Sequence, residues 1–228
     1  IIARAGRQRV EDGGEKLVSV TDNGCGMAPD DLLTAFESHA TSKIKDEEDL
    51  LRVATLGFRG EALASIAEIA RVTLISRSRD DEHAWELQVE GGRAGDLRAA
   101  ARAPGTTVTV EDLFFNTPVR KRFLKKGASE LRQARATVTA YALATPGVGW
   151  TLDVDGKRVL DLAPTTGLRQ RVLQIHGQRL DQGLIDLDWR EESITLRGIL
   201  GVPELSRSGT QHQVLFVNGR WVSAPWIG

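Results

Sequence analysis

Two glycines flank a Phe-Arg pair in TLGFRGEALASI, immediately before an alanine-rich amphipathic run. Glycine at the start of a helix costs backbone entropy, so it indicates an unusual φ/ψ or a close approach of something to the main chain. The N–H groups of Gly57 and Gly60, the positive end of the helix dipole and the Arg59 guanidinium could together hold a phosphate. A tight helix-packing turn explains the same residues, and this stretch alone leaves both interpretations open.

DNGCGM, at Asp22–Met27, directly follows a strand-like segment. A carboxylate at a strand end can accept a hydrogen bond from an exocyclic amine, while Gly24 and Gly26 let a flat ring approach the backbone. Asp-Asn-Gly is also ordinary turn chemistry, which needs no ligand. The stretch is not a calcium loop, because the required series of oxygen-donating side chains does not continue after Asn23 and the twelfth position is Leu33 instead of Glu.

Two further polar stretches have two interpretations each. SHATSKI, at Ser38–Ile44, offers hydroxyl groups and one cation, which fit either a ligand contact or a helix C-terminus. The basic cluster of Arg120–Arg122 with Lys125 and Lys126 fits either a solvated face or a contact with a phosphate backbone.

The sequence lacks the motifs of several other kinds of catalytic or metal site. The Walker A pattern G-x-x-x-x-G-K-[ST] is absent, which excludes a P-loop, and there is no G-x-S-x-G elbow. The four histidines are scattered, and with one cysteine they make no metal-ligand spacing.

Composition places the chain among ordinary globular proteins, with 41% hydrophobic and 27% charged residues in 228. The net charge of −1 means that a nucleic acid or membrane contact would need a local patch. The single cysteine, Cys25, rules out a disulfide framework, and no apolar run reaches membrane-spanning length. The amino end lacks both Met and a signal-peptide pattern, so we expect a fragment of a longer protein.

The pattern of elements predicts an α+β fold with helices on one face of a largely antiparallel sheet. Hairpins are expected around Asp12–Gly14 and around Asp155-Gly156. Helices are expected to start at Pro29 and to span 59–70, 129–145 and 168–175; further strands are expected at 72–76, 84–90, 106–113, 184–189, 193–202 and 213–217. A break near Ala163-Pro164 predicts two domains, 1–163 and 164–228.

The order of these stretches is more specific than any one of them. DNGCGM, HATSKI, LGFRGEALASI, PGTTVTVEDLFFNTPVRKRFL and FVNGR, in that order, closely resemble the amino-terminal region of the MutL mismatch-repair family, from about Val10 to about Trp221. That family belongs to the gyrase, Hsp90, histidine-kinase and MutL class of ATPases. The resemblance implies a Bergerat-type ATP-binding α/β sandwich followed by a partial domain of the ribosomal-S5-like type. A histidine kinase or a gyrase subunit is disfavoured by GFRGEAL and HATSKI.

The resemblance also implies roles for residues. Asp22 would bind the adenine amino group, Gly24 and Gly26 would give the ring room, and Thr106 would support the adenine side through its hydroxyl or a water. The ribose and phosphates would be contacted by Thr41, Ser42 and Lys43, which lie in a lid segment, and by the GFRG turn. The full implied set is Asp22, Gly24, Gly26, Met27, Thr41, Ser42, Lys43, Gly57, Phe58, Arg59, Gly60 and Thr106.

The resemblance implies that nucleotide binding orders the lid and dimerises the amino-terminal region. The dimer would then signal to MutS-type proteins and to a downstream nuclease or helicase. The resemblance also implies weak DNA binding and a bacterial cytoplasmic location at the nucleoid. IIARAG does not match the family's first motif, which carries the general-base Glu and the Mg²⁺-ligand Asn, and the chain stops before the γ-phosphate lysine. We therefore expect ATP binding with poor hydrolysis. The alternative is a non-catalytic DNA- or protein-binding module that retains the fold.

Overall fold

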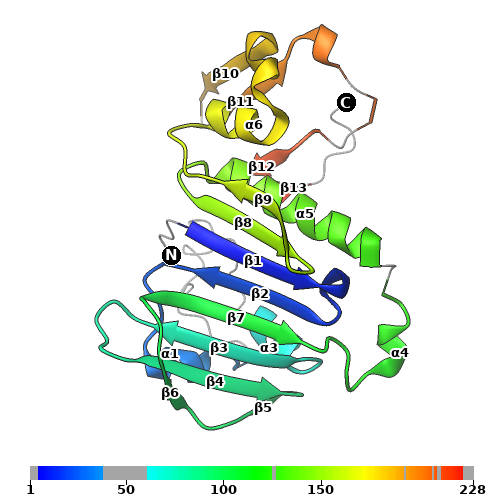
Figure 1. Ribbon diagram of the computed structural model, residues 1–228. Helices are drawn as coiled ribbons and strands as arrows, with labels where there is room; N and C mark the ends of the chain where they lie inside the picture. Colours follow the sequence, from blue (N-terminus) through cyan, green and yellow to red (C-terminus); the bar gives the residue numbers. More distant parts are fainter. Residues whose placement is uncertain are drawn as a thin grey trace.

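A nine-stranded sheet dominates the computed structural model (Figure 1), which describes residues 5–37, 61–124, 127–192, 194–206, 208–209 and 212–222. The strand order is β5-β4-β3-β7-β2-β1-β8-β9, with β6 also paired to β4. Every pairing is antiparallel except β1 with β8. The strands are β1 Ala5–Glu11, β2 Leu17–Asp22, β3 Arg71–Arg77, β4 Ala84–Glu90, β5 Arg93–Ala94, β6 Arg98–Ala100, β7 Gly105–Glu111, β8 Gly149–Val154 and β9 Lys157–Leu162.

Both predicted hairpins are present. The short helix η1, Asp12–Gly14, joins β1 to β2, and its three residues all have positive φ. Asp155 and Gly156 join β8 to β9 with φ of 46° and 77°, the pair of left-handed residues that a two-residue hairpin turn needs. The two Asp-Gly turns, which the sequence predicts, therefore set the register of β1 with β2 and of β8 with β9.

One face of the sheet is apolar across its six central strands. Paired residues on neighbouring strands share a face, so a single row of valines runs across six strands. That row is Val154, Val10, Val18, Val110, Val72 and Val89. This face is the side on which the core forms, since five of these six valines belong to, or pack against, the two buried clusters.

Helices cover that face, as predicted, and Figure 1 shows them behind the sheet. The helices α1, Pro29–Thr34, and α3, Ala62–Ala67, pack over β3 and β4 through the fully buried Leu32 and Ala67. The long helix α5, Gly127–Ala144, packs over β8 and β1 through Leu131 and Val138. The apolar sheet face thus carries two separate cores, one at each side.

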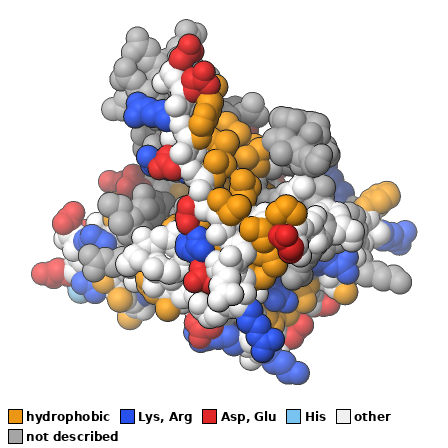
Figure 2. Space-filling model, turned by 90° about the horizontal axis from the view of Figure 1, so that it is seen from above, with side chains coloured by type: hydrophobic (Ala, Val, Ile, Leu, Met, Phe, Trp, Pro, Cys, Tyr) orange, Lys and Arg blue, Asp and Glu red, His pale blue; other side chains and the backbone are white. Residues whose placement is uncertain are grey.

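The rest of the chain forms smaller units. The helix α6, Leu168–His176, packs against α5, and the hairpin of β10, Leu184–Glu191, with β11, Ile194–Gly201, lies beyond it. Figure 2 looks down on this side of the molecule, where hydrophobic side chains gather at the surface. Ile185, Leu200, Trp189, Leu196 and Ile194 share one face of this hairpin and are all exposed. The remaining elements are α4 Pro118–Lys121, η2 Gln178–Gly183, η3 Pro203–Leu205, β12 Leu215–Val217 and β13 Arg220–Val222.

A buried arginine joins the two parts. Arg171, fully buried on α6, donates from Nη2 to the carbonyl oxygens of Pro146 and Val148, at 2.8 and 2.6 Å, just past the end of α5. The large sheet ends at Leu162 and α6 begins at Leu168, so we propose the domain boundary at residues 163–164 between them. None of the helices in the described ranges combines the length and apolar character needed to cross a membrane.

Candidate nucleotide-binding site

The polar residues of the candidate site converge at one end of the large sheet, where β2 and β3 end and β7 begins. Asp22, Ser76 and Thr106 lie two residues along their strands from Val20, Leu74 and Val108, respectively. Because side chains alternate between the faces of a strand, all three side chains lie on the face that the helices cover. Three strands distant in sequence therefore bring a carboxylate and two hydroxyls to one place.

Ser76 is the centre of the arrangement, and its side chain is fully buried. Its Oγ accepts a hydrogen bond from the Met27 N–H at 2.8 Å and lies 3.0 Å from both the Gly105 carbonyl oxygen and Thr106 Oγ1. The carbonyl can only accept, so the Ser76 hydroxyl donates to it and Thr106 donates to Ser76. Thr106 then keeps its lone pairs for whatever occupies the site.

The DNGCGM stretch forms a loop held against the end of β3. Asp22 Oδ1 accepts a hydrogen bond from the Gly24 N–H at 2.7 Å, and the Cys25 carbonyl accepts one from the Arg79 N–H at 3.1 Å. Gly26 has φ of 73°, and a Cβ there would lie 1.8 Å from the Arg77 carbonyl oxygen. Close approach to the backbone of β3 explains this glycine without a ligand.

Gly105 is confined in the same way from the other side. Its φ is 129°, and a Cβ would lie 2.2 Å from the Asp22 carbonyl oxygen and 2.9 Å from Nη2 of Arg102. That nitrogen donates to the same carbonyl at 2.9 Å. The glycine therefore allows β7, Arg102 and the end of β2 to meet.

Sequence reasoning missed two of these residues. Ser76 is a hydroxyl at a core-facing position of a strand, a signal that alternation with Val72 and Leu74 could have provided. Arg102 lies before Pro104 in a segment outside the strands, and nothing in its sequence neighbourhood indicates its partners.

The structure brings together the predicted residues Asp22, Gly24, Gly26, Met27 and Thr106. The other predicted residues lie outside the described residues: Thr41, Ser42, Lys43, Gly57, Phe58, Arg59 and Gly60. Within the described ranges, no group of three or more His, Cys, Asp or Glu side chains is placed to hold a metal ion.

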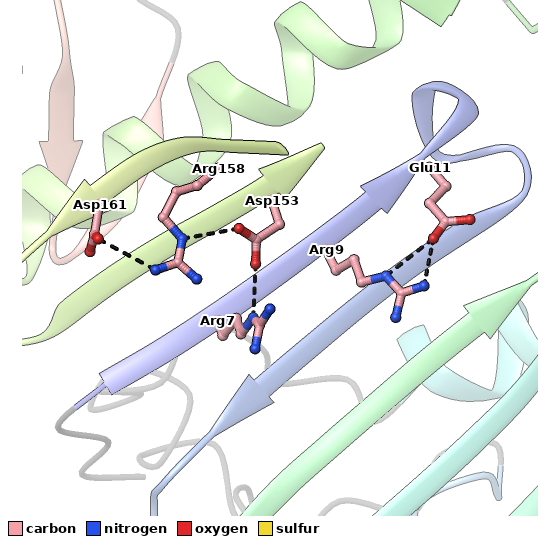
Figure 3. A network of polar contacts seen from close by, with 6 residues as sticks. All are labelled: Arg7, Arg9, Glu11, Asp153, Arg158 and Asp161. Carbon is pink, nitrogen blue, oxygen red and sulfur yellow. Dashed lines mark hydrogen bonds and ion pairs between the residues drawn. The ribbon is translucent and has the colours of Figure 1, made fainter. Parts of the chain in front are cut away.

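The opposite face of the sheet carries a separate ion-pair network (Figure 3). The Asp153 carboxylate binds Nε of Arg7 at 2.8 Å and Nε of Arg158 at 3.0 Å, and Arg158 also reaches Asp161 at 3.4 Å. The hydrogen bond from Arg158, reinforced by that from Arg7, lowers the pKa of Asp153 below its ordinary value. Since Arg7 alternates with the inward-facing Gln8, this network does not belong to the candidate site.

The basic cluster is on the surface. Arg120, Lys121 and Arg122 are exposed on and after the short helix α4, and Lys121 pairs with Glu15 at 2.8 Å. The neighbouring Phe123 is 82% exposed. This cluster is a surface feature separate from the candidate site.

Comparison with known proteins identifies the family. Residues 7–109 match the family described as histidine kinase-, DNA gyrase B- and HSP90-like ATPase, and residues 172–227 match the family described as DNA mismatch repair protein, C-terminal domain. A DNA mismatch repair protein MutL from Paramagnetospirillum magneticum is 42% identical over 225 residues, and one from Geotalea daltonii is 41% identical over 213. The chain belongs to the MutL family of DNA mismatch-repair proteins.

The structural comparisons agree with this membership. The Aquifex aeolicus MutL ATPase domain complexed with ADP is similar over 99% of this chain and 78% of its own, with a TM-score of 0.72 and 29% identity. The N-terminal domain of a DNA repair protein has the same fold, with a TM-score of 0.78 at 24% identity. The predicted fold class is therefore confirmed as that of the MutL ATPase region, and the match at 172–227 agrees with the S5-like part.

The two curated MutL proteins are much longer than this chain. The matched region covers 95% and 93% of the chain but only 37% and 36% of those two relatives. The chain thus spans about a third of the length of these two MutL proteins.

Proposed function

We propose that this MutL-family chain binds ATP at the end of the sheet, with Asp22 as the anchor of the adenine amino group. The observation that supports this is the placement of the Asp22 carboxylate and the Thr106 hydroxyl on one sheet face, where the Gly24 N–H donates to the carboxylate and the buried Ser76 hydroxyl contacts Thr106. The Aquifex relative was solved with ADP, so the fold is known to hold an adenine nucleotide in that protein.

The geometry fits a flat ring carrying an exocyclic amine. The bond from the Gly24 N–H fixes the Asp22 carboxylate, which still has acceptor capacity for an amine. Thr106 faces the site as an acceptor, either directly or through a water. Val20, on the same face and 44% exposed, offers an apolar surface beside them.

The remaining roles are proposals that rest on the sequence motifs. Thr41, Ser42 and Lys43 would contact ribose or phosphate, and the main chain of Gly57–Gly60 would wrap the phosphates. Bound Mg²⁺ would neutralise phosphate charge. Nucleotide binding would order the lid and promote a homodimer that signals to MutS-type proteins and to a downstream nuclease or helicase. The protein would act in the cytoplasm and would bind DNA weakly.

Titration with a non-hydrolysable ATP analogue tests the site. The parent chain is expected to bind saturably, and Asp22→Asn is expected to weaken binding by about tenfold or more, because the amide presents a donor to the adenine amine. Asp96→Asn, an exposed acid between β5 and β6, is the matched control and should bind as the parent does. Unchanged affinity in Asp22→Asn would contradict the proposal.

A second candidate function, contact with DNA, is favoured by the exposed α4 cluster, where Arg120 and Arg122 flank Lys121 beside the exposed Phe123. Replacing both arginines with Gln should weaken DNA binding and make the slope of the logarithm of the binding constant against the logarithm of the salt concentration shallower by about two. The affinity for the ATP analogue should stay unchanged. Arg132→Gln and Arg135→Gln on the exposed side of α5 form a charge-matched control. DNA binding that is identical in both double variants would remove the α4 cluster from consideration.

A further inference from the structure

Arg102 makes an unusual set of contacts for a residue outside the strands. Its Nε donates to the Ala103 carbonyl at 2.9 Å, its Nη1 to the Ile75 carbonyl at 2.9 Å and to Thr107 Oγ1 at 3.0 Å, and its Nη2 to the Asp22 carbonyl at 2.9 Å. One guanidinium therefore bonds to the ends of β2 and β3 and to the start of β7. Four directed bonds from a rigid planar group hold their acceptors in one arrangement.

The contact to Asp22 lies where the pairing of β2 with β7 stops. The ladder between β2 and β7 ends at Thr21 with Thr107, so Asp22 is one residue beyond the last pair on the β7 side, while on the other side it pairs with Gly6 of β1. Gly105 has no Cβ to keep Arg102 away from that carbonyl. The Asp22 main chain is thus held by Arg102 on the β7 side and by its pairing with Gly6 on the β1 side, and its side chain is held by the Gly24 N–H.

The two faces of the sheet contribute different parts of this arrangement. Ser76 lies on the helix-covered face, whereas Thr107, which Arg102 contacts, alternates with Thr106 and lies on the other. Arg102 is partly buried, and burial lowers the pKa of its guanidinium while the Asp22 charge opposes that effect. It stays protonated at neutral pH, because arginine titrates far above it.

We infer that Arg102 is a positioning residue that sets the adenine preference of the site by fixing the main chain of Asp22 from the face opposite the nucleotide. This inference rests on the proposed function, since it assigns the nucleobase specificity of that same site. Guanine carries a carbonyl oxygen where adenine carries the amine, so a correctly placed Asp22 carboxylate accepts from adenine and repels guanine. A displaced carboxylate loses this discrimination, whereas groups that contact the phosphates are unaffected.

The test compares binding of non-hydrolysable ATP and GTP analogues to the parent chain and to Arg102→Met. The substitution is expected to weaken binding of the ATP analogue by about tenfold and to change that of the GTP analogue by less than about twofold. Arg102→Lys keeps the charge and part of the hydrogen bonding, so its affinity for the ATP analogue should fall between those of the parent chain and Arg102→Met. Arg98→Met, an exposed arginine on β6, is the matched control and should retain full adenine preference.

A double-mutant cycle separates positioning from general stability. In an Asp22→Asn background, Arg102→Met should no longer change the ratio of ATP to GTP affinity, because the group it positions is gone. Thr107→Val removes only one partner of Arg102, so it provides a milder variant if Arg102→Met does not fold, and it should reduce the ratio by less.

Each result has a defined meaning. Equal loss of both analogues in Arg102→Met, or an unchanged ratio in the folded Arg102 and Thr107 variants, overturns the positioning role while leaving the proposed ATP site intact. No saturable binding of the ATP analogue to the parent chain means that the proposed function itself has failed, and this inference falls with it.

Discussion

Gly26 combines a left-handed backbone with contact against a neighbouring strand. At φ of 73° its position is unfavourable for any side chain, and a Cβ would lie 1.8 Å from the Arg77 carbonyl oxygen and 2.4 Å from its carbon. Gly26→Ala is therefore expected to lower the free energy of unfolding by about 2–4 kcal/mol, measured by denaturant titration. Gly147→Ala, where a Cβ meets nothing within 4 Å, should change it by less than about 0.5 kcal/mol. Equal effects of the two substitutions would contradict the packing of the loop against β3.

Ser76 holds three polar groups with one buried hydroxyl. Ser76→Ala leaves the Met27 N–H and the Gly105 carbonyl without this partner, at a cost of about 1–3 kcal/mol in the free energy of unfolding. It also releases the Thr106 hydroxyl, so we expect weaker binding of an ATP analogue in calorimetry. Ser65→Ala, an exposed serine on α3, is the control. Full stability in Ser76→Ala would show that the hydroxyl is dispensable.

At the scale of elements, the pairing of β1, β8 and β9 includes a pH-dependent contribution to stability. The Asp153 side chain is only 9% exposed, and Arg158 and Arg7 lower its pKa in the folded chain. A carboxyl group with a lowered folded pKa stabilises the protein above its ordinary value, near pH 3.9, and loses that contribution as the pH falls through the lowered value.

Melting temperatures measured between pH 7 and pH 2 test this contribution. Below about pH 4, the parent chain is expected to lose stability more steeply than Asp153→Asn, which cannot titrate at this position. The side chain of Asp188 is 71% exposed in its pair with Arg197, so Asp188→Asn should follow the parent profile. Parallel profiles for the parent and Asp153→Asn would rule out the assigned role.

Elements with strong local signals were predictable from the sequence, and those held by tertiary contacts were not. The Asp-Gly turns and the proline at the start of α1 fix local backbone geometry, so the hairpins and that helix start were predicted correctly. The strands β5, β6 and β13 contain two or three residues each, too few to show alternation. Of the strand expected at 213–217, only Leu215–Val217 is one.

The residues of the candidate site likewise include some that the sequence predicts and some that it does not. Asp22, Gly24 and Gly26 lie in one continuous motif, so their proximity follows from the sequence. Alternation along β3 could place Ser76 on the core-facing side, but the partners of Ser76 and Arg102 come from other strands and from a loop, and no local pattern predicts them. The roles assigned to Thr41–Lys43 and Gly57–Gly60 stay predictions, as these residues lie outside the described ranges.

At the scale of the whole molecule, one sheet connects the candidate site to both cores. A nucleotide that binds only the folded chain should therefore stabilise it as a unit, by about 2.7 kcal/mol at 100 times the dissociation constant. For a chain of this size that corresponds to a rise of roughly 5–10 °C in melting temperature. Circular dichroism and tryptophan fluorescence should report the same rise, and a roughly tenfold weaker affinity in Asp22→Asn should reduce it to about half at the same analogue concentration. An equal rise in Asp22→Asn would place the stabilising site elsewhere.

The parallel pairing of β1 with β8 limits the order in which these strands can pair during synthesis. Ala5 of β1 pairs with Gly149 of β8, although 144 positions separate them (149 − 5), so one edge of β1 waits for most of the chain to be made. The β1–β2 hairpin can form much earlier and exposes that edge in the meantime. Charged residues on an open strand discourage pairing with other chains. We therefore expect Arg7 and Arg9 to disfavour pairing of this edge with another chain until Asp153 binds Arg7.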